Sequence, residues 1–187
     1  VATAVEPFSL SPAVVQPRTK NQAPPSALLA PSDTSWPALV RRGQFEQVLQ
    51  LARRQGLDRC LSACGAEDLW AVADAARYFG QVELSTKALM SHRRRFARSM
   101  KAAMAAFLLG RHAEDSGGGL ADAQLWYASY MREAPGGPLA GEALGRQMVV
   151  LEKLGRTAEA KEAAKRYVMR FEGGSYEPVA RTLMQGR

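Results

Sequence analysis

Two cysteines and two histidines are the side chains of this sequence best suited to metal binding, disulfide formation or nucleophilic chemistry. Cys60 and Cys64 lie in the segment DRCLSACGAED, and their spacing of four places both on one face of a helix. They either form a disulfide, which an oxidising compartment would permit, or fill a helix–helix joint as two small buried side chains. A zinc site needs further ligands, and only His92 and His112 are available, so no metal site is predicted.

Other patterns that carry catalysis are incomplete. The segment EDSGGGLAD (114–122) is rich in glycine but lacks the Gly-Lys-Ser/Thr ending of a phosphate loop, and no predicted strand precedes it. No Ser-His-Asp or Cys-His set stands out. Carboxylates sit at solvent-facing helical spacing beside basic residues, as Glu162 does beside Lys165. We therefore expect no enzyme, no catalytic residue and no cofactor.

The net charge of +7 is concentrated in one part of the chain. Residues 41–101 carry twelve basic and six acidic groups, and the excess centres on the segment SHRRRFARSMK. The basic patch predicted there consists of Arg93, Arg94, Arg95, Arg98 and Lys101. Such a run either complements a helix dipole in solvent or binds an acidic protein or lipid surface, and nucleic acid is the least favoured partner.

Helices must position these side chains. After residue 40 the sequence is dominated by Ala, Leu, Arg, Glu and Met, which favour helix, and it has no alternating pattern long enough for a sheet. No apolar stretch is long enough to span a bilayer. The sequence therefore predicts an all-α fold.

Residues 1–31 differ from the rest, because they hold most of the ten prolines and few charges. Proline fixes φ and removes a donor, so we expect an extended Pro-rich tether there, followed by a helical domain at 32–187. The chain begins at Val1 rather than Met, so we expect either a fragment of a longer protein or a mature chain whose targeting or anchoring segment has been removed.

The helical part contains an internal repeat. Four segments align on Gly43, Gly80, Gly118 and Gly155, which are 37, 38 and 37 residues apart. Each glycine separates two predicted helices, because glycine accepts the left-handed conformation at a helix C-terminus. The first helices are predicted at 33–42, 67–79, 99–115 and 139–154, with a further helix at 177–185. Small residues five positions after the glycines, and large ones nine or twelve positions after them, are expected to pack between helices.

This pattern resembles the tetratricopeptide repeat (TPR). The third unit is most similar, with Gly118, Ala123, Tyr127, Tyr130 and Pro135, and the resemblance covers residues 33–187. It implies an α-solenoid of about four helical hairpins whose first helices line a concave partner-binding groove. Mapped onto this sequence, that groove is lined by Trp70, Asp74, Arg77, Phe107, Arg111, Glu114 and Arg146.

The joints between units, such as WYASYMREAPGGPLAGEAL, are also similar to those of periplasmic TPR proteins. These include envelope proteins of the Tol–Pal and outer-membrane assembly systems and the periplasmic regions of FecR-like anti-sigma regulators. The resemblance implies a protein- or peptide-binding module in the envelope of a Gram-negative bacterium. An alternative is a structural scaffold subunit with the Pro-rich arm strapped across a neighbour.

Overall fold

Ten α-helices and no strand make up the regular structure of the residues that the computed structural model describes, 34–116 and 119–186. For these residues the predicted all-α class is confirmed. The helices are α1 (Trp36–Arg41), α2 (Phe45–Gln55), α3 (Leu57–Ala63), α4 (Ala66–Tyr78), α5 (Val82–Arg95), α6 (Met100–Asp115), α7 (Leu120–Glu133), α8 (Ala140–Lys153), α9 (Thr157–Arg170) and α10 (Glu177–Gln185). The compact helical unit begins at Thr34, and the arm predicted at residues 1–31 lies outside the described residues.

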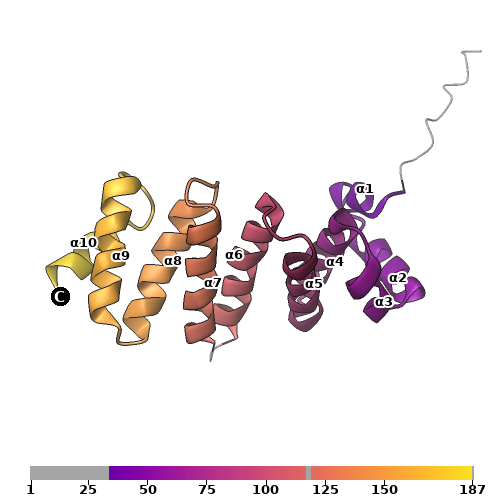
Figure 1. Ribbon diagram of the computed structural model, residues 1–187, viewed down its shortest axis with the longest axis horizontal. Helices are drawn as coiled ribbons and strands as arrows, with labels where there is room; N and C mark the ends of the chain where they lie inside the picture. Colours follow the sequence, from indigo (N-terminus) through magenta and orange to yellow (C-terminus); the bar gives the residue numbers. More distant parts are fainter. Residues whose placement is uncertain (1–33, 117–118, 187) are drawn as a thin grey trace, which may run out of the picture. The chain divides into compact units, whose positions relative to one another are not determined.

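From α4 onward, each helix packs against the next one in the chain. This sequence of contacts runs from the α4–α5 pair to the α9–α10 pair, and Figure 1 shows the helices standing side by side in chain order. At the other end, α1 and α2 pack on α4, and α3 packs on both α2 and α5. The described helices therefore depend on contacts between neighbours, as repeat folds do.

Glycines end the first helices of three hairpins in the left-handed conformation that the sequence predicted. Gly43, Gly80 and Gly155 have φ of +73°, +66° and +72°. The residue after each glycine donates its backbone N–H to the carbonyl five residues earlier, as Arg156 does to Leu151 at 2.9 Å. This pattern is the Schellman motif, which satisfies the last carbonyls of a helix and turns the chain. Gly118 lies outside the described residues.

The second helices begin two residues after the aligned glycines, at Phe45, Val82, Leu120 and Thr157. Five positions after the glycines, Val48, Ser85, Ala123 and Ala160 are completely buried. The large side chains predicted to fill the space between helices are buried as well, namely Leu89, Tyr127, Tyr130 and Tyr167. The repeat spacing therefore gave the packing positions correctly.

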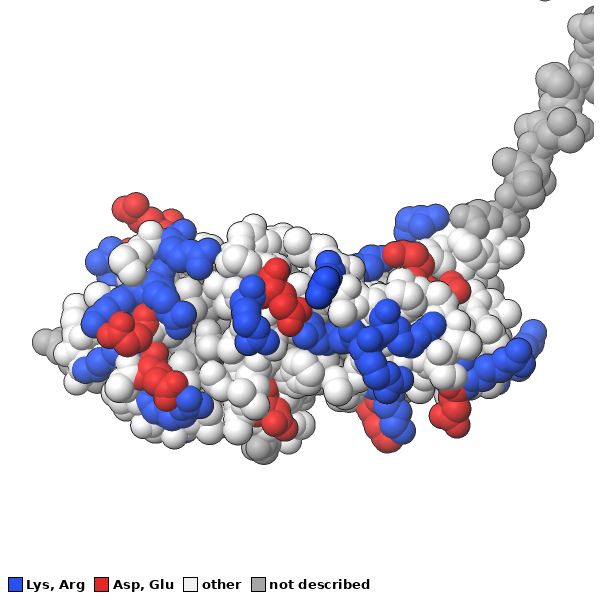
Figure 2. Space-filling view, viewed as in Figure 1, with Lys and Arg blue, Asp and Glu red and all other residues white. Residues whose placement is uncertain are grey.

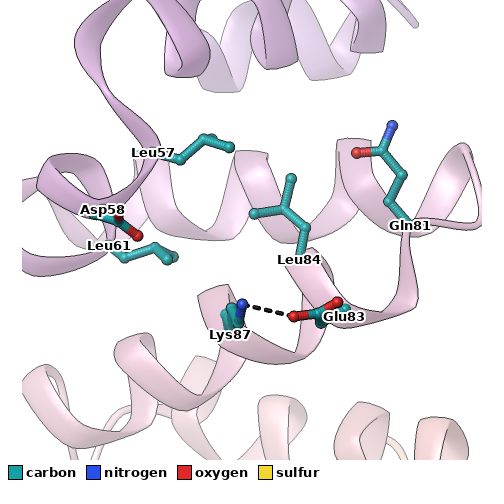
Figure 3. A pocket seen from close by; sticks show the side chains of 7 residues that line it. All are labelled: Leu57, Asp58, Leu61, Gln81, Glu83, Leu84 and Lys87. Carbon is teal, nitrogen blue, oxygen red and sulfur yellow. Dashed lines mark hydrogen bonds and ion pairs between the residues drawn. The ribbon is translucent and has the colours of Figure 1, made fainter.

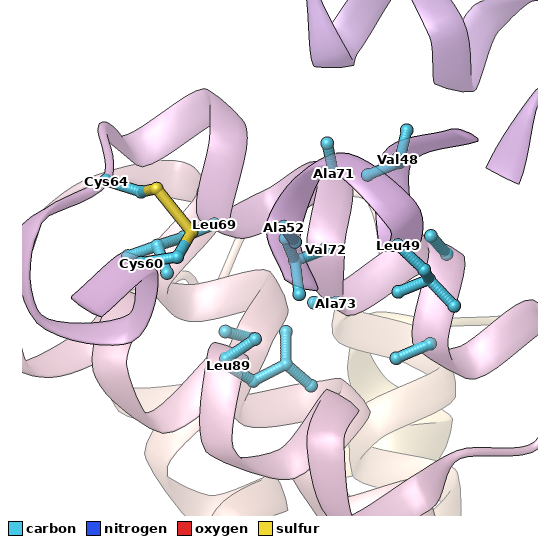
Figure 4. Packing of buried hydrophobic residues seen from close by; sticks show 14 of the residues in the cluster. Val48, Leu49, Ala52, Cys60, Cys64, Leu69, Ala71, Val72, Ala73 and Leu89 are labelled. Atoms are coloured by element: carbon cyan, nitrogen blue, oxygen red, sulfur yellow. A yellow bond between two sulfur atoms is a disulfide. The ribbon is translucent and has the colours of Figure 1, made fainter. Parts of the chain in front are cut away.

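Helix α3 has no counterpart in the other described hairpins, and the repeat alignment did not include it, although the cysteine spacing had indicated a helix at Cys60. Gly56, with φ of +89°, separates it from α2, and it ends at Ala63. Its buried residue, Cys60, packs into the first of three core clusters, together with residues of α2, α4 and α5 (Figure 4). Cys64 lies just beyond the helix in an extended conformation rather than on the same helical face as Cys60.

Successive hairpins are joined by a tyrosine at the end of one second helix. The Tyr130 hydroxyl accepts a hydrogen bond from the backbone N–H of Leu139 at 2.9 Å, and Tyr167 does the same for Tyr176 at 3.1 Å. Both acceptors satisfy an N–H at the start of the following helix. The hydroxyls approach so closely because the facing residues are glycines, Gly137 and Gly174.

We predict that Gly137→Ala lowers the free energy of unfolding by about 1–3 kcal/mol, the usual cost of overpacking. A Cβ at this position would lie 2.5 Å from the Tyr130 hydroxyl oxygen. Gly136→Ala is the matched control, since a Cβ there has no atom within 4 Å. Denaturant unfolding of both variants measures the difference, and equal stabilities would contradict this account of the joint.

Candidate binding surfaces

Three residues of the predicted groove lie on α4. Trp70 is half-buried, with the His92 ring against its edge at 5.7 Å and the Lys101 ammonium over its ring at 5.6 Å. Asp74 accepts a hydrogen bond from Arg77 at 3.2 Å, and the arginine remains largely exposed. Trp70 therefore packs mainly within the chain, whereas Arg77 reaches solvent.

Phe107 belongs to the core. Its side chain is 5% exposed, and its ring lies 5.7 Å from that of Tyr127 and 6.1 Å from that of Tyr130. It holds α6 against α7 and offers almost no surface to a partner.

Glu114 and Arg146 belong to a hydrogen-bonded network between helices. Glu114 accepts from the Tyr127 hydroxyl at 2.7 Å and from Arg146 at 3.0 Å. Arg146 also donates to Glu142 at 2.7 Å, and the Tyr176 hydroxyl donates to the same carboxylate at 3.1 Å. Burial and the bond to Glu114 raise the pKa of Tyr127, so it stays protonated as the donor. Both residues of the predicted groove are therefore satisfied within the fold.

Arg111 differs from the other predicted residues. It is half-buried, and its Nε is enclosed without a hydrogen-bond partner among the described residues. Among the seven residues predicted for the groove, Arg77 thus offers a largely exposed cationic side chain, whereas the Nε of Arg111 is enclosed.

The predicted basic patch is divided between internal pairs and free cations. Arg93 forms a bidentate pair with Glu133 at 2.7 and 2.9 Å, and its guanidinium lies 5.4 Å from the centre of the Trp126 ring. Lys101 pairs with Glu67, and Arg95 donates to the Leu61 carbonyl at 3.4 Å while its guanidinium lies over the Phe96 ring.

Arg94 and Arg98 are exposed and have no ion pair among the described residues. Figure 2 shows Lys and Arg side chains gathered around α5, with acidic side chains beside them. Within the five-residue patch, Arg93 and Lys101 are therefore ion-paired, Arg95 has a backbone hydrogen bond but no ion pair among the described residues, and Arg94 and Arg98 are exposed.

Cys60 and Cys64 form a disulfide, and both are buried (Figure 4). Their Cα atoms are 4.6 Å apart. The bridge joins the middle of α3 to the residue after its end, where the Leu61 carbonyl also accepts from Ser91 and Arg95 of α5. The short helix α3 is thereby held on α5.

A cavity of about 400 Å³ lies between α3 and the start of α5 (Figure 3). Leu57, Leu61 and Leu84 supply its apolar wall, and the Lys87–Glu83 ion pair, 2.7 Å long, lies at its edge. Because α3 is present in one hairpin only, this cavity has no counterpart in the other hairpins.

An exposed apolar surface is the feature that sequence reasoning missed. Tyr78 and Phe79 are 67% and 47% exposed, and Val82 and Met90 of α5 are exposed at the mouth of a cavity of about 360 Å³. Trp126 and Leu109 form the opposite wall. We call Tyr78, Phe79, Val82, Met90 and Trp126 the apolar strip. Its sequence signal was the spacing of Val82, Thr86 and Met90 along one face of α5.

His92, in the last turn of α5, is a buried titratable residue. Its side chain is 1% exposed, and neither ring nitrogen has a partner among the described residues. Burial lowers its pKa, and Lys101, Arg93 and Arg95 lower it further against the opposing effect of Glu67. Burial lowers the pKa of His112 in the same direction.

Within the described residues no group of three or more His, Cys, Asp or Glu side chains is placed to hold a metal ion. No described helix combines the length and apolar character needed to cross a bilayer.

Comparisons with protein-family models, curated proteins and solved structures find no match to this chain. The fold class therefore rests on the helices and their contacts, and the resemblance to TPR proteins remains a prediction.

We predict that reduction lowers the melting temperature of the wild-type chain but not that of a Cys60→Ala/Cys64→Ala variant. Closing this short loop contributes about 2 kcal/mol in the chain-entropy model. Thermal unfolding with and without a reductant measures the effect. An equal shift in both proteins would show that the stability does not depend on the bridge.

We also predict that stability falls as the pH drops below about 6.5, the ordinary pKa of histidine. Because folding lowers the pKa of His92, the unfolded chain binds its proton more readily and is favoured in acid. His92→Phe should weaken this dependence, while His112 retains a part of it. Melting temperatures from about pH 7.5 to about pH 5.5 test the effect, and an unchanged slope in the variant would contradict it.

Proposed function

We propose that this chain is a non-catalytic protein-interaction module, an α-solenoid of four TPR-like hairpins followed by one further helix. The hairpins would be α1–α2, α4–α5, α6–α7 and α8–α9. Support comes from the spacing of the second helices, from the contacts between successive helices, and from the repeated Schellman turns and tyrosine joints. Repeat arrays of this kind present long surfaces to other proteins.

The single observation that carries a binding function is the apolar strip. Large side chains such as Tyr78 and Met90 stay exposed, and Val82 and Met90 line a cavity together with Trp126. A contiguous exposed apolar surface with aromatic residues is typical of protein-binding sites, because its burial in a complex releases water from apolar area.

The matching groove one hairpin later has a different chemistry. Gln124 and Gln147 stand 38 residues after Thr86 and Leu109, and they line a smaller cavity of about 260 Å³. The repeat thus places an amide-lined groove where the earlier hairpin has an apolar one. This difference favours a partner that contacts the α5–α7 region rather than every hairpin.

For location, we propose the cell envelope of a Gram-negative bacterium, as the resemblance to periplasmic TPR proteins implies. The Cys60–Cys64 disulfide supports an oxidising compartment. Within that location we favour the sensing or scaffolding part of a membrane-anchored FecR-like regulator, tethered through a segment upstream of Val1. The alternative is a scaffold subunit with residues 1–31 strapped across a neighbour, and a structure with its partner would separate the two.

The binding function is tested by selecting ligands from a random peptide display library on the 187-residue chain. Selected peptides are then measured against wild type and a Val82→Ser/Met90→Ser variant. We expect the variant to lose roughly tenfold or more in affinity, since truncating an interface hot spot costs more than about 1 kcal/mol per residue.

Met169→Ser is the matched control, because this methionine is also exposed but lies on α9. It should bind the selected peptides as wild type does. Failure to enrich any peptide, or equal binding by the strip variant, would remove the support for a binding function of this surface.

A further inference from the structure

A second cavity, of about 420 Å³, lies where the turn between α5 and α6 meets the end of α7. Ala97 and Ala102 form its apolar walls, and Arg93, Arg98 and Glu133 supply its charges. Since Glu133 is paired with Arg93, the cation left available to a ligand is Arg98. Its surroundings therefore carry one uncompensated positive charge, with Arg94 exposed nearby on α5.

Arg98 lies in a turn whose backbone conformation is unfavourable for a residue with a side chain. Its φ is +66°, and it is the one non-glycine residue with positive φ among the described residues. The matching turn after α9 has Gly173, with φ of +74°, whereas Gly136, at the same place after α7, does not have a positive φ. A side chain in the left-handed region costs roughly 1–2 kcal/mol, so a glycine would suit the turn better than arginine. Replacing Arg98 by glycine would remove the guanidinium from the cavity.

Among the described residues, no carboxylate forms an ion pair with this arginine. Helix α6 has no acidic residue in its first turn, whereas α4, α5, α7, α8 and α9 each have at least one. The nearest acidic group in the cavity is Glu133, which already accepts both hydrogen bonds of Arg93. The Arg98 guanidinium is therefore available to form an ion pair with a carboxylate of a ligand.

The cavity adjoins the apolar strip through one side chain. Trp126 is a wall of the strip, and the guanidinium of Arg93, which lines the basic cavity, is positioned over the Trp126 ring. A single segment of chain that covers the strip would thus reach Arg98 by passing over this arginine–tryptophan pair.

We propose that the basic cavity binds a side-chain carboxylate of an acidic partner peptide whose apolar residues cover the apolar strip. This inference rests on the proposed function and names the chemistry of its partner. The net charge of the cavity matches a monoanion. A phosphate monoester would add a second negative charge near Glu133, and the adjoining apolar strip favours a peptide with apolar side chains over nucleic acid or a lipid headgroup.

Two matched peptide pools test the proposal. Both are drawn from apolar sequences with a fixed aromatic anchor, and one carries Asp or Glu where the other carries Asn or Gln. We expect wild type to bind the acidic pool roughly fivefold more tightly at low salt, and we expect added salt to reduce the preference.

Arg98→Gly should abolish this preference while preserving or raising the melting temperature, because it restores the residue that the turn favours. Arg98→Lys, which keeps the charge, should retain a preference for the acidic pool. Since the glycine variant is expected to be well folded, a loss of preference reports the charge rather than unfolding.

Three results would overturn the proposal. The first is wild-type binding without a preference between pools, and the second is a preference that survives Arg98→Gly. The third is tighter binding of single-stranded DNA or phosphatidylglycerol vesicles than of the acidic pool, with this binding lost in Arg98→Gly.

The two proposals can fail separately. If Val82→Ser/Met90→Ser weakens binding of both pools while Arg98→Gly changes neither, the proposed function stands and the carboxylate site is wrong. If the strip variant changes neither pool, the proposed function fails first.

Discussion

The hydrogen bond from the first backbone N–H of one hairpin to a buried tyrosine of the preceding hairpin is the constraint on which the described fold depends. A helix that starts inside an array cannot rely on water for its orphan N–H groups. Tyr130 and Tyr167 supply the acceptor from the preceding unit, and Gly137 and Gly174 leave room for it. This contact fixes how α8 follows α7 and how α10 follows α9.

At the end of the second hairpin, the N–H groups at the start of α6 are satisfied by other residues. His92 stands where the later units have tyrosine, and Ser99 stands where they have Gly137 and Gly174. A serine Cβ would collide with a tyrosine hydroxyl, and the smaller imidazole avoids this. Helix α6 is then capped by its own Ser99, whose hydroxyl accepts from the Ala102 N–H at 3.0 Å. Freed from the tyrosine contact, this turn is also where a non-glycine residue, Arg98, adopts positive φ beside a cavity.

The sequence predicted the helical class and the repeat because these depend on local signals. Gly80 and Gly155 indicate turns because glycine readily adopts positive φ, and their spacing can be read from the sequence without knowing any tertiary contact. The candidate site was predictable only in part. Whether Arg93 is free depends on Glu133, forty residues away, and whether Phe107 is exposed depends on the ring of Tyr127. Helix α3 was missed because its residues follow no repeat position.

A repeated framework also explains why binding residues and packing residues are separable in this chain. Positions that hold the hairpins together are filled by alanine, glycine and buried aromatic residues in unit after unit, so they carry no information about a partner. Some positions that line the grooves differ from one unit to the next. Thr86 and Leu109 in one groove are replaced by Gln124 and Gln147 in the next. Specificity in such an array therefore resides in the groove and turn positions that depart from the repeat.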